Sequence, residues 1–131
     1  MQIPLNIAIP EHLDIISEEF SQELHAIATF TEYKDFPQGD DELVRRIGDA
    51  QFVIVKWQLL NDAVLEKLPH LKYIITLSVG YDHIPVKKAT ELGIKVINCP
   101  VHNTYAVVEH TFALLFAHFR KVQESEGADP L

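Results

Sequence analysis

The stretch that decides the fold is residues 71–84, LKYIITLSVGYDHI. Tyr73 to Leu77 is a short apolar run with β-branched residues, which favours a buried strand. A glycine loop, Ser78 to His83, follows at once, and Ile84-Pro85-Val86 predicts the start of a helix that Gly93 ends. A buried strand that leads through a short loop into a helix is the repeating unit of an α/β fold.

Four other apolar runs have the same strand-like composition, and longer amphipathic segments separate them. The runs are Asn6–Ile9, Ala26–Phe30, Phe52–Val55 and Lys95–Ile97. This alternation indicates a parallel sheet with crossover helices. The sequence therefore predicts one α/β domain over residues 1–103, built on a five-stranded parallel sheet with flanking helices.

Three more connecting helices are expected between these strands. The second and third are Asp40–Ile47, which ends at Gly48, and Asn61–Leu68, which its first residue caps and Pro69 stops. The first has a single apolar face, formed at three- and four-residue steps by Leu13, Ile16, Phe20 and Leu24.

A final helix is predicted from about Thr104 to Val122, and apolar residues surround most of its circumference. A helix with this pattern is usually buried on several sides, whereas one domain can cover only one of them. The other sides therefore imply a partner outside this chain. Residues 123–131 are polar and without periodicity, and we expect them to be a disordered tail.

The composition excludes several classes of partner. The chain has 19 acidic and 11 basic residues and a formal charge of -8, and the basic residues are scattered, so no nucleic-acid surface is expected. Its single cysteine, Cys99, excludes an internal disulfide and fits the reducing cytoplasm, where we expect the protein. The N-terminus does not resemble a signal peptide, and the apolar segment Tyr105–Phe119 is shorter than the roughly 20 residues of a membrane span.

In an open parallel sheet, ligands bind beyond the carboxyl ends of the strands. The loop Ser78–His83 is the most informative there, because a glycine after a buried strand lets backbone amides approach a small anion closely. An anionic ligand is the interpretation that follows. The other loops at this edge are Pro10–His12, Lys56–Gln58 and Asn98–Asn103.

Each candidate residue also has a purely structural interpretation. Gly80 can be an ordinary turn residue, Asn103 can be the cap of the last helix, and Lys56 can be a surface lysine. Three histidines lack the spacing of a zinc motif and can all be structural, so no metal site is predicted: His83, His102 and His110.

Three separated motifs stand out: the strand and glycine loop of Leu71–Ile84, the segment Gly93–Pro100 with its Asn-x-Pro ending, and the helix start Asn103–His110 with Ala-Val-x-Glu-His. Together they resemble the motifs of the D-isomer-specific 2-hydroxyacid dehydrogenases, a family of oxidoreductases. The resemblance covers roughly residues 5 to 120, and the motifs occur in the family's order and spacing.

The resemblance implies a flavodoxin-like substrate domain, in which the amides of Val79 and Gly80 bind the carboxylate of a small 2-hydroxy or 2-oxo acid. Asn103 corresponds to an asparagine that contacts substrate in formate dehydrogenase members. Lys56 falls near a position where some members carry an arginine. The last helix corresponds to the one that crosses to a domain that binds NAD or NADP.

The residues that carry the chemistry in complete members are missing from this sequence. Those members continue into a Rossmann domain with a Gly-x-Gly-x-x-Gly loop, an arginine and a glutamate–histidine pair, and no Gly-x-Gly occurs here. His110 does not correspond to the catalytic histidine. We therefore expect no catalytic residue, no cofactor-binding residue and no tight cofactor binding, and a truncated dehydrogenase that is inactive alone.

Non-enzymatic proteins of the same topology are the main alternative. A phospho-receiver needs an acidic pair after the first strand and an aspartate after the third, where this sequence has Pro10-Glu11 and Lys56-Trp57. A flavodoxin needs a hydroxyl-rich phosphate loop after the first strand, and Pro10–Leu13 offers no hydroxyl group. The sequence therefore argues against both classes. A scaffold or regulatory module that pairs through its last helix remains. The apolarity of that helix, Thr104 to Val122, predicts a homodimer.

Overall fold

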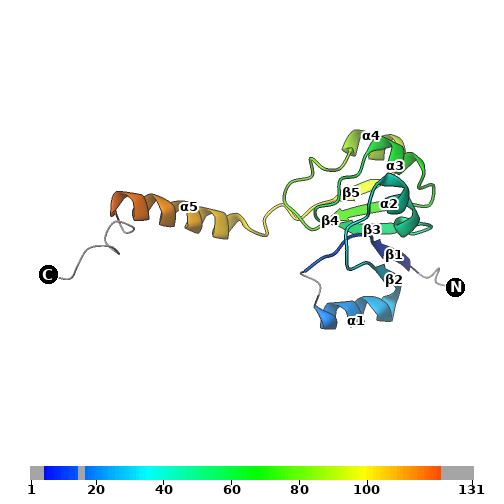
Figure 1. The fold of residues 1–131 in the computed structure, drawn as a ribbon, viewed down its shortest axis with the longest axis horizontal. Helices are drawn as coiled ribbons and strands as arrows, with labels where there is room; N and C mark the ends of the chain where they lie inside the picture. The colour runs from blue at the N-terminus through cyan, green and yellow to red at the C-terminus, as the bar shows by residue number, and fades with distance from the viewer. Residues whose placement is uncertain (1–4, 15–16, 122–131) are drawn as a thin grey trace. The chain divides into compact units, whose positions relative to one another are not determined.

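The computed structural model describes residues 5–14 and 17–121, and the chain forms two compact units that meet at Pro100 and Val101. The first unit contains five strands and four helices (Figure 1). The second contains one helix, α5 (Thr104–Phe119). The predicted end of α5 at Val122 and the predicted tail lie outside the described residues.

The five strands form one parallel sheet in the order β2-β1-β3-β4-β5, which is the flavodoxin-like order that the sequence and the resemblance predicted. Five residue pairs align β1 with β2 and four align β3 with β4, whereas only two align β1 with β3. The strands are β1 (Leu5–Ile9), β2 (Ala28–Glu32), β3 (Phe52–Val55), β4 (Tyr73–Thr76) and β5 (Lys95–Ile97).

The first helix, α1 (Glu18–Ile27), begins later than predicted. Ser17 is its N-cap, and the Ser17 hydroxyl accepts a hydrogen bond from the Phe20 amide at 3.1 Å. Leu13 is buried but lies before the helix, so the predicted four-residue apolar face is wrong. Ile16 lies outside the described residues. Local capping by a serine ahead of two glutamates decides this boundary, and the apolar spacing does not.

The other helices agree closely with the predicted segments: α2 (Asp40–Ile47), α3 (Asp62–Glu66) and α4 (Val86–Glu91). Gly48 ends α2 with a φ of 53°, a left-handed conformation that favours glycine. The Asn61 side chain caps α3 by accepting a hydrogen bond from the Val64 amide at 2.9 Å, as predicted.

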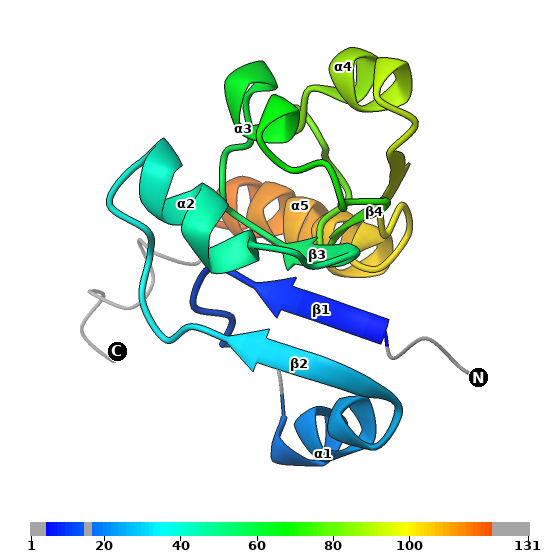
Figure 2. The same ribbon diagram turned by 90° about the vertical axis from the view of Figure 1, so that its right-hand side faces the viewer.

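The core lies on both faces of the sheet, because successive side chains of a strand point to opposite faces. The larger cluster includes Leu43 of α2, Val64 of α3 and Ala89 of α4. The smaller cluster contains Leu24 of α1 together with Leu13. Figure 2 shows α1 beside β2, away from α2, α3 and α4. No helix in the described part of the chain is long and apolar enough to cross a membrane.

Candidate functional site

The carboxyl ends of β1 and β3 are joined by one buried carboxylate. Glu11, directly after β1, is 0% exposed. Its Oε1 accepts hydrogen bonds from the backbone amides of Lys56 at 2.6 Å, Trp57 at 3.1 Å and Gln58 at 3.1 Å. Three successive amides around one carboxylate form an anion-binding nest, which the chain fills with its own side chain.

This nest lies where flavodoxin-like sheets usually bind their ligand. The strand order reverses between β1 and β3, and the crevice at that point is the general ligand position in such sheets. Because the Glu11 carboxylate uses the amides there, a second anion cannot bind them. The other candidate at this edge is the loop at the end of β4.

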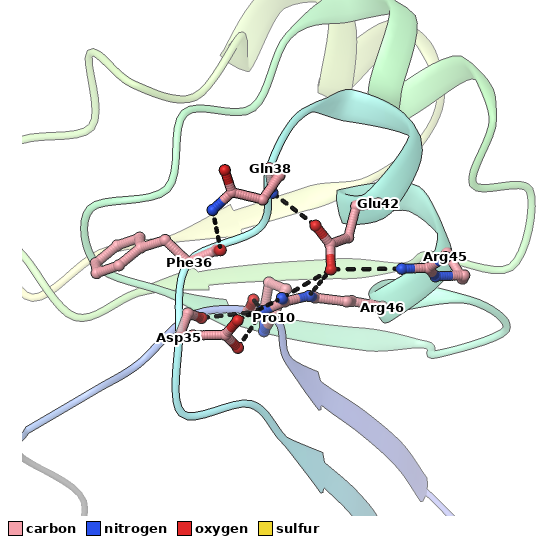
Figure 3. A network of polar contacts seen from close by, with 7 residues as sticks. All are labelled: Pro10, Asp35, Phe36, Gln38, Glu42, Arg45 and Arg46. Carbon is pink, nitrogen blue, oxygen red and sulfur yellow. Dashed lines mark hydrogen bonds and ion pairs between the residues drawn. The ribbon is translucent and has the colours of Figure 1, made fainter.

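An arginine cluster holds the backbone next to Glu11 (Figure 3). Arg46 of α2 is 6% exposed and donates to the carbonyl oxygen of Pro10 at 3.0 Å. Its guanidinium also donates to the Asp35 carboxylate at 3.1 Å and the Glu42 carboxylate at 2.9 Å. The hydrogen bond with Asp35, followed by that with Glu42, raises the pKa of Arg46, and its charge stays fixed in this network.

In the loop after β4, each of the first three backbone carbonyls, those of residues 78–80, accepts a hydrogen bond. The Cys99 amide donates to the carbonyl oxygen of Ser78 at 3.0 Å. The Asn98 side-chain nitrogen donates to that of Val79 at 2.8 Å, and the Ser78 hydroxyl donates to that of Gly80 at 2.6 Å. The peptide planes on both sides of Gly80 are therefore fixed.

These contacts orient the amides of Val79 and Gly80. In a trans peptide, the N–H points opposite to the C=O of the same plane. The carbonyls of Ser78 and Val79 are bonded to residues 98–99, so the amides of Val79 and Gly80 point away from that segment. Among residues 5–14 and 17–121, neither amide donates to any acceptor. Two oriented, unbonded amides are what a small carboxylate needs.

The backbone at Gly80 does not itself require glycine. Its φ lies outside the left-handed region, and a Cβ there would meet only Asp82 Oδ2, at 3.7 Å. These ordinary backbone angles are compatible with Gly80 being either a turn residue or a ligand-binding residue.

A cavity of about 310 Å³ opens beside this loop. That volume is at the small end of ligand sites in proteins and suits a small organic acid. Lys56 is half-buried, and its Nζ lies 4.9 Å from the centre of the Trp57 ring. The lining residues are Lys56, Trp57, Ser78, Gly80, Asp82 and His83. The structure thus places two predicted site residues, Lys56 and Gly80, in the lining of one cavity, with Val79 adjacent in the chain.

Asn103 belongs to the second unit. It occupies the N-cap position of α5, but its side chain makes no capping hydrogen bond, so the interpretation as a side-chain cap is wrong. His102 and His110 are exposed. Within the described ranges, no three His, Cys, Asp or Glu side chains gather where they could hold a metal ion.

The family model for the D-isomer specific 2-hydroxyacid dehydrogenase catalytic domain matches residues 7–125. This chain belongs to that family. Two relatives in the D-2-hydroxyacid dehydrogenase family are glyoxylate reductases. That of Thermofilum pendens is 40% identical over 96 residues, which are 72% of this chain and 28% of the relative. That of Pyrococcus furiosus is 32% identical over 121 residues, 91% of this chain and 34% of the relative.

A solved structure supports the same family assignment. An acyclic imino acid reductase in complex with NADPH and D-Arg has a TM-score of 0.86 and 30% identity, over 95% of this chain and 42% of its own. The chain thus spans between 28% and 42% of the length of these three similar proteins. Its catalytic-domain portion carries the flavodoxin-like sheet and the Ser78–Gly80 loop.

Proposed function

We propose that this chain forms the carboxylate-binding part of the substrate site of an NAD(P)-dependent oxidoreductase that acts on the CH–OH group of small 2-hydroxy acids. The observation that carries the proposal is the pair of oriented, unbonded amides of Val79 and Gly80. The cavity beside them is the right size for a small 2-hydroxy or 2-oxo acid.

The roles of the chain's residues follow from this geometry. The amides of Val79 and Gly80 donate to the substrate carboxylate, and the ammonium group of Lys56 adds a positive charge to the cavity wall. Asp82 contributes a negative charge to the same wall, so the donors must offset its repulsion of an anion. Asn103, after β5 in the chain, is a further substrate contact in this proposal.

A nicotinamide dinucleotide does not fit the described residues in the way it fits a Rossmann domain. Its pyrophosphate needs free amides at a switch point, and Glu11 takes those amides here. We therefore expect no tight NAD or NADP binding by this chain alone. Without a hydride donor or acceptor held against the substrate, we expect the chain alone not to oxidise NADH with 2-oxo acids.

An amide NMR titration of the full chain with oxamate tests the substrate site. Saturable shifts at Val79, Gly80 and Asn103 are expected, and the neutral diamide oxamide, which lacks the carboxylate, should cause much smaller shifts. No saturable change at Val79 and Gly80, or equal responses to the two compounds, would overturn the proposal.

We also propose that α5 pairs with a second copy of this chain. Large apolar side chains lie on all sides of α5, including Tyr105 at 81% exposure and Phe119 at 70%, and the described residues of its own unit do not cover them. Sedimentation velocity should show a homodimer at micromolar concentration. A strictly monomeric species, with Phe116→Glu behaving like the wild type, would contradict this.

A further inference from the structure

A chain of side-chain hydrogen bonds lies behind the candidate carboxylate site. It begins at His83, whose Nε2 lies 3.2 Å from the hydroxyl oxygen of Thr76. The Thr76 hydroxyl lies 2.7 Å from that of Ser78, and the Ser78 hydroxyl donates to the carbonyl oxygen of Gly80 at 2.6 Å. Thr76 is the last residue of β4 and is 0% exposed, so water cannot replace its partners.

We call this chain of hydrogen bonds, from His83 through Thr76 and Ser78 to the Gly80 carbonyl, the relay. The donor and acceptor of each of its hydrogen bonds can be assigned by starting from the Gly80 end. A carbonyl oxygen only accepts, so the single hydroxyl proton of Ser78 goes to Gly80. Ser78 must then accept from Thr76, and the proton of Thr76 is used in that bond. Thr76 can therefore only accept from His83. The His83 Nε2 must carry a hydrogen, which fixes the tautomer of the neutral ring.

The relay restrains Gly80, the residue of the site whose backbone is intrinsically the most flexible. Glycine has the widest choice of backbone angles, so an unheld Gly80 would cost binding free energy to order. Asn98 holds the peptide plane before Gly80, and the relay holds the plane after it. His83 is itself anchored, because its carbonyl oxygen accepts from the Leu60 amide at 2.9 Å.

We propose that His83 is a positioning residue, which acts through Thr76 and Ser78 to hold the Gly80 loop in the conformation that presents its amides to the substrate carboxylate. This inference rests on the proposed function for the ligand it names. The relay itself rests on the hydrogen-bond geometry alone, so the two can fail separately.

Two variants of His83 separate positioning from packing. His83→Phe keeps an aromatic ring and removes the donor, whereas His83→Gln places an amide nitrogen the same number of bonds from Cα as Nε2. Losing one hydrogen bond of about 1 kcal/mol corresponds to a roughly fivefold weaker affinity. We expect oxamate binding about fivefold weaker in His83→Phe and close to wild type in His83→Gln. His70→Phe, at a histidine 62% exposed near Asp49, is the matched control.

Combined variants test the connectivity of the relay. His83→Phe should add little to Ser78→Ala, because both break the same chain of bonds. It should add fully to Asn98→Leu, which releases the other peptide plane. Thermal unfolding of each variant shows whether its fold is retained. Independent effects of His83→Phe and Ser78→Ala would contradict the relay.

Two measurements without ligand keep the inference testable if the wild type does not bind oxamate. In ¹⁵N NMR spectra at a pH where the ring is neutral, the hydrogen of His83 should be on Nε2. The amides of Val79, Gly80 and Tyr81 should become more mobile in His83→Phe than in His83→Gln. A hydrogen on Nδ1, or equal mobility in the two variants, would overturn the inference whatever oxamate does.

Discussion

Gly80→Ala separates the requirements of the fold from those of the ligand. The added methyl group would meet only Asp82 Oδ2, at an ordinary contact distance of 3.7 Å, and φ is outside the left-handed region. At a backbone-compatible site, Gly to Ala stabilises a protein by about 0.4–1 kcal/mol, because the unfolded chain loses freedom. The oxamate affinity of Gly80→Ala, in contrast, should fall. If the methyl group displaces the carboxylate from one amide, the lost charge-assisted hydrogen bond of about 1.5–3 kcal/mol weakens oxamate binding roughly 10- to 100-fold.

Urea unfolding gives the free energy of unfolding, and the NMR titration gives the oxamate affinity. Gly39→Ala is the matched control, since Gly39 has a φ of 138° and no atom within 4 Å of an added Cβ. It should lose stability by about 1 kcal/mol or more and keep the oxamate affinity. A Gly80→Ala chain that binds oxamate like the wild type, or that is destabilised like Gly39→Ala, would refute the reasoning.

Three other perturbations test the elements that support the site. Glu11→Gln replaces the charged acceptor of the amides of residues 56–58 with a neutral one and should cost about 2–3 kcal/mol in urea unfolding, against little change for Glu23→Gln at an exposed position of α1. Asn61→Ala removes the cap of α3 and should cost about 1 kcal/mol by the same measurement. The hydrogen bond from the Gln38 amide, followed by that from Arg46, lowers the pKa of Glu42 below its usual 4.5. The ionised Glu42 carboxylate therefore stabilises the fold above pH 4.5, and this stabilisation is lost as the pH falls through the lowered pKa. Stability curves between pH 6 and 3 should therefore be flatter for Glu42→Gln; parallel curves would contradict this.

Much of the sheet could be predicted because its strands are short apolar runs with residues that favour turns or helix starts between them. Phe52–Val55 and Lys95–Ile97 have the predicted bounds, and Gly48 ends α2 where the sequence indicated. The start of α1 could not be read from apolar spacing, since Leu13 packs into the core from outside the helix. A serine followed by Glu18 and Glu19 was the local signal that decides it.

The glycine loop at the end of β4 could be singled out from sequence, but the long-range contacts that hold the neighbouring loops after β1 and β3 could not. Glu11 bonds residues 45 to 47 positions later, and Arg46 reaches Pro10 across 36 positions. Such pairs depend on which strands become neighbours, and single-residue patterns do not encode this. An acidic residue directly after a buried strand was the one available signal for Glu11. The sequence likewise could not show that Gly80 has ordinary backbone angles, because only its φ in the structure shows this.

The short pairing between β1 and β3 makes this junction the place where the sheet can come apart. Two aligned residue pairs join the β2-β1 half to the β3-β4-β5 half, and the Glu11 carboxylate extends that junction by three further hydrogen bonds. Opening here would create two new unpaired strand edges, which are templates for aggregation. We therefore expect Glu11 to oppose a partial opening of the sheet at this junction, and amide hydrogen exchange in β1 measures how often that opening occurs.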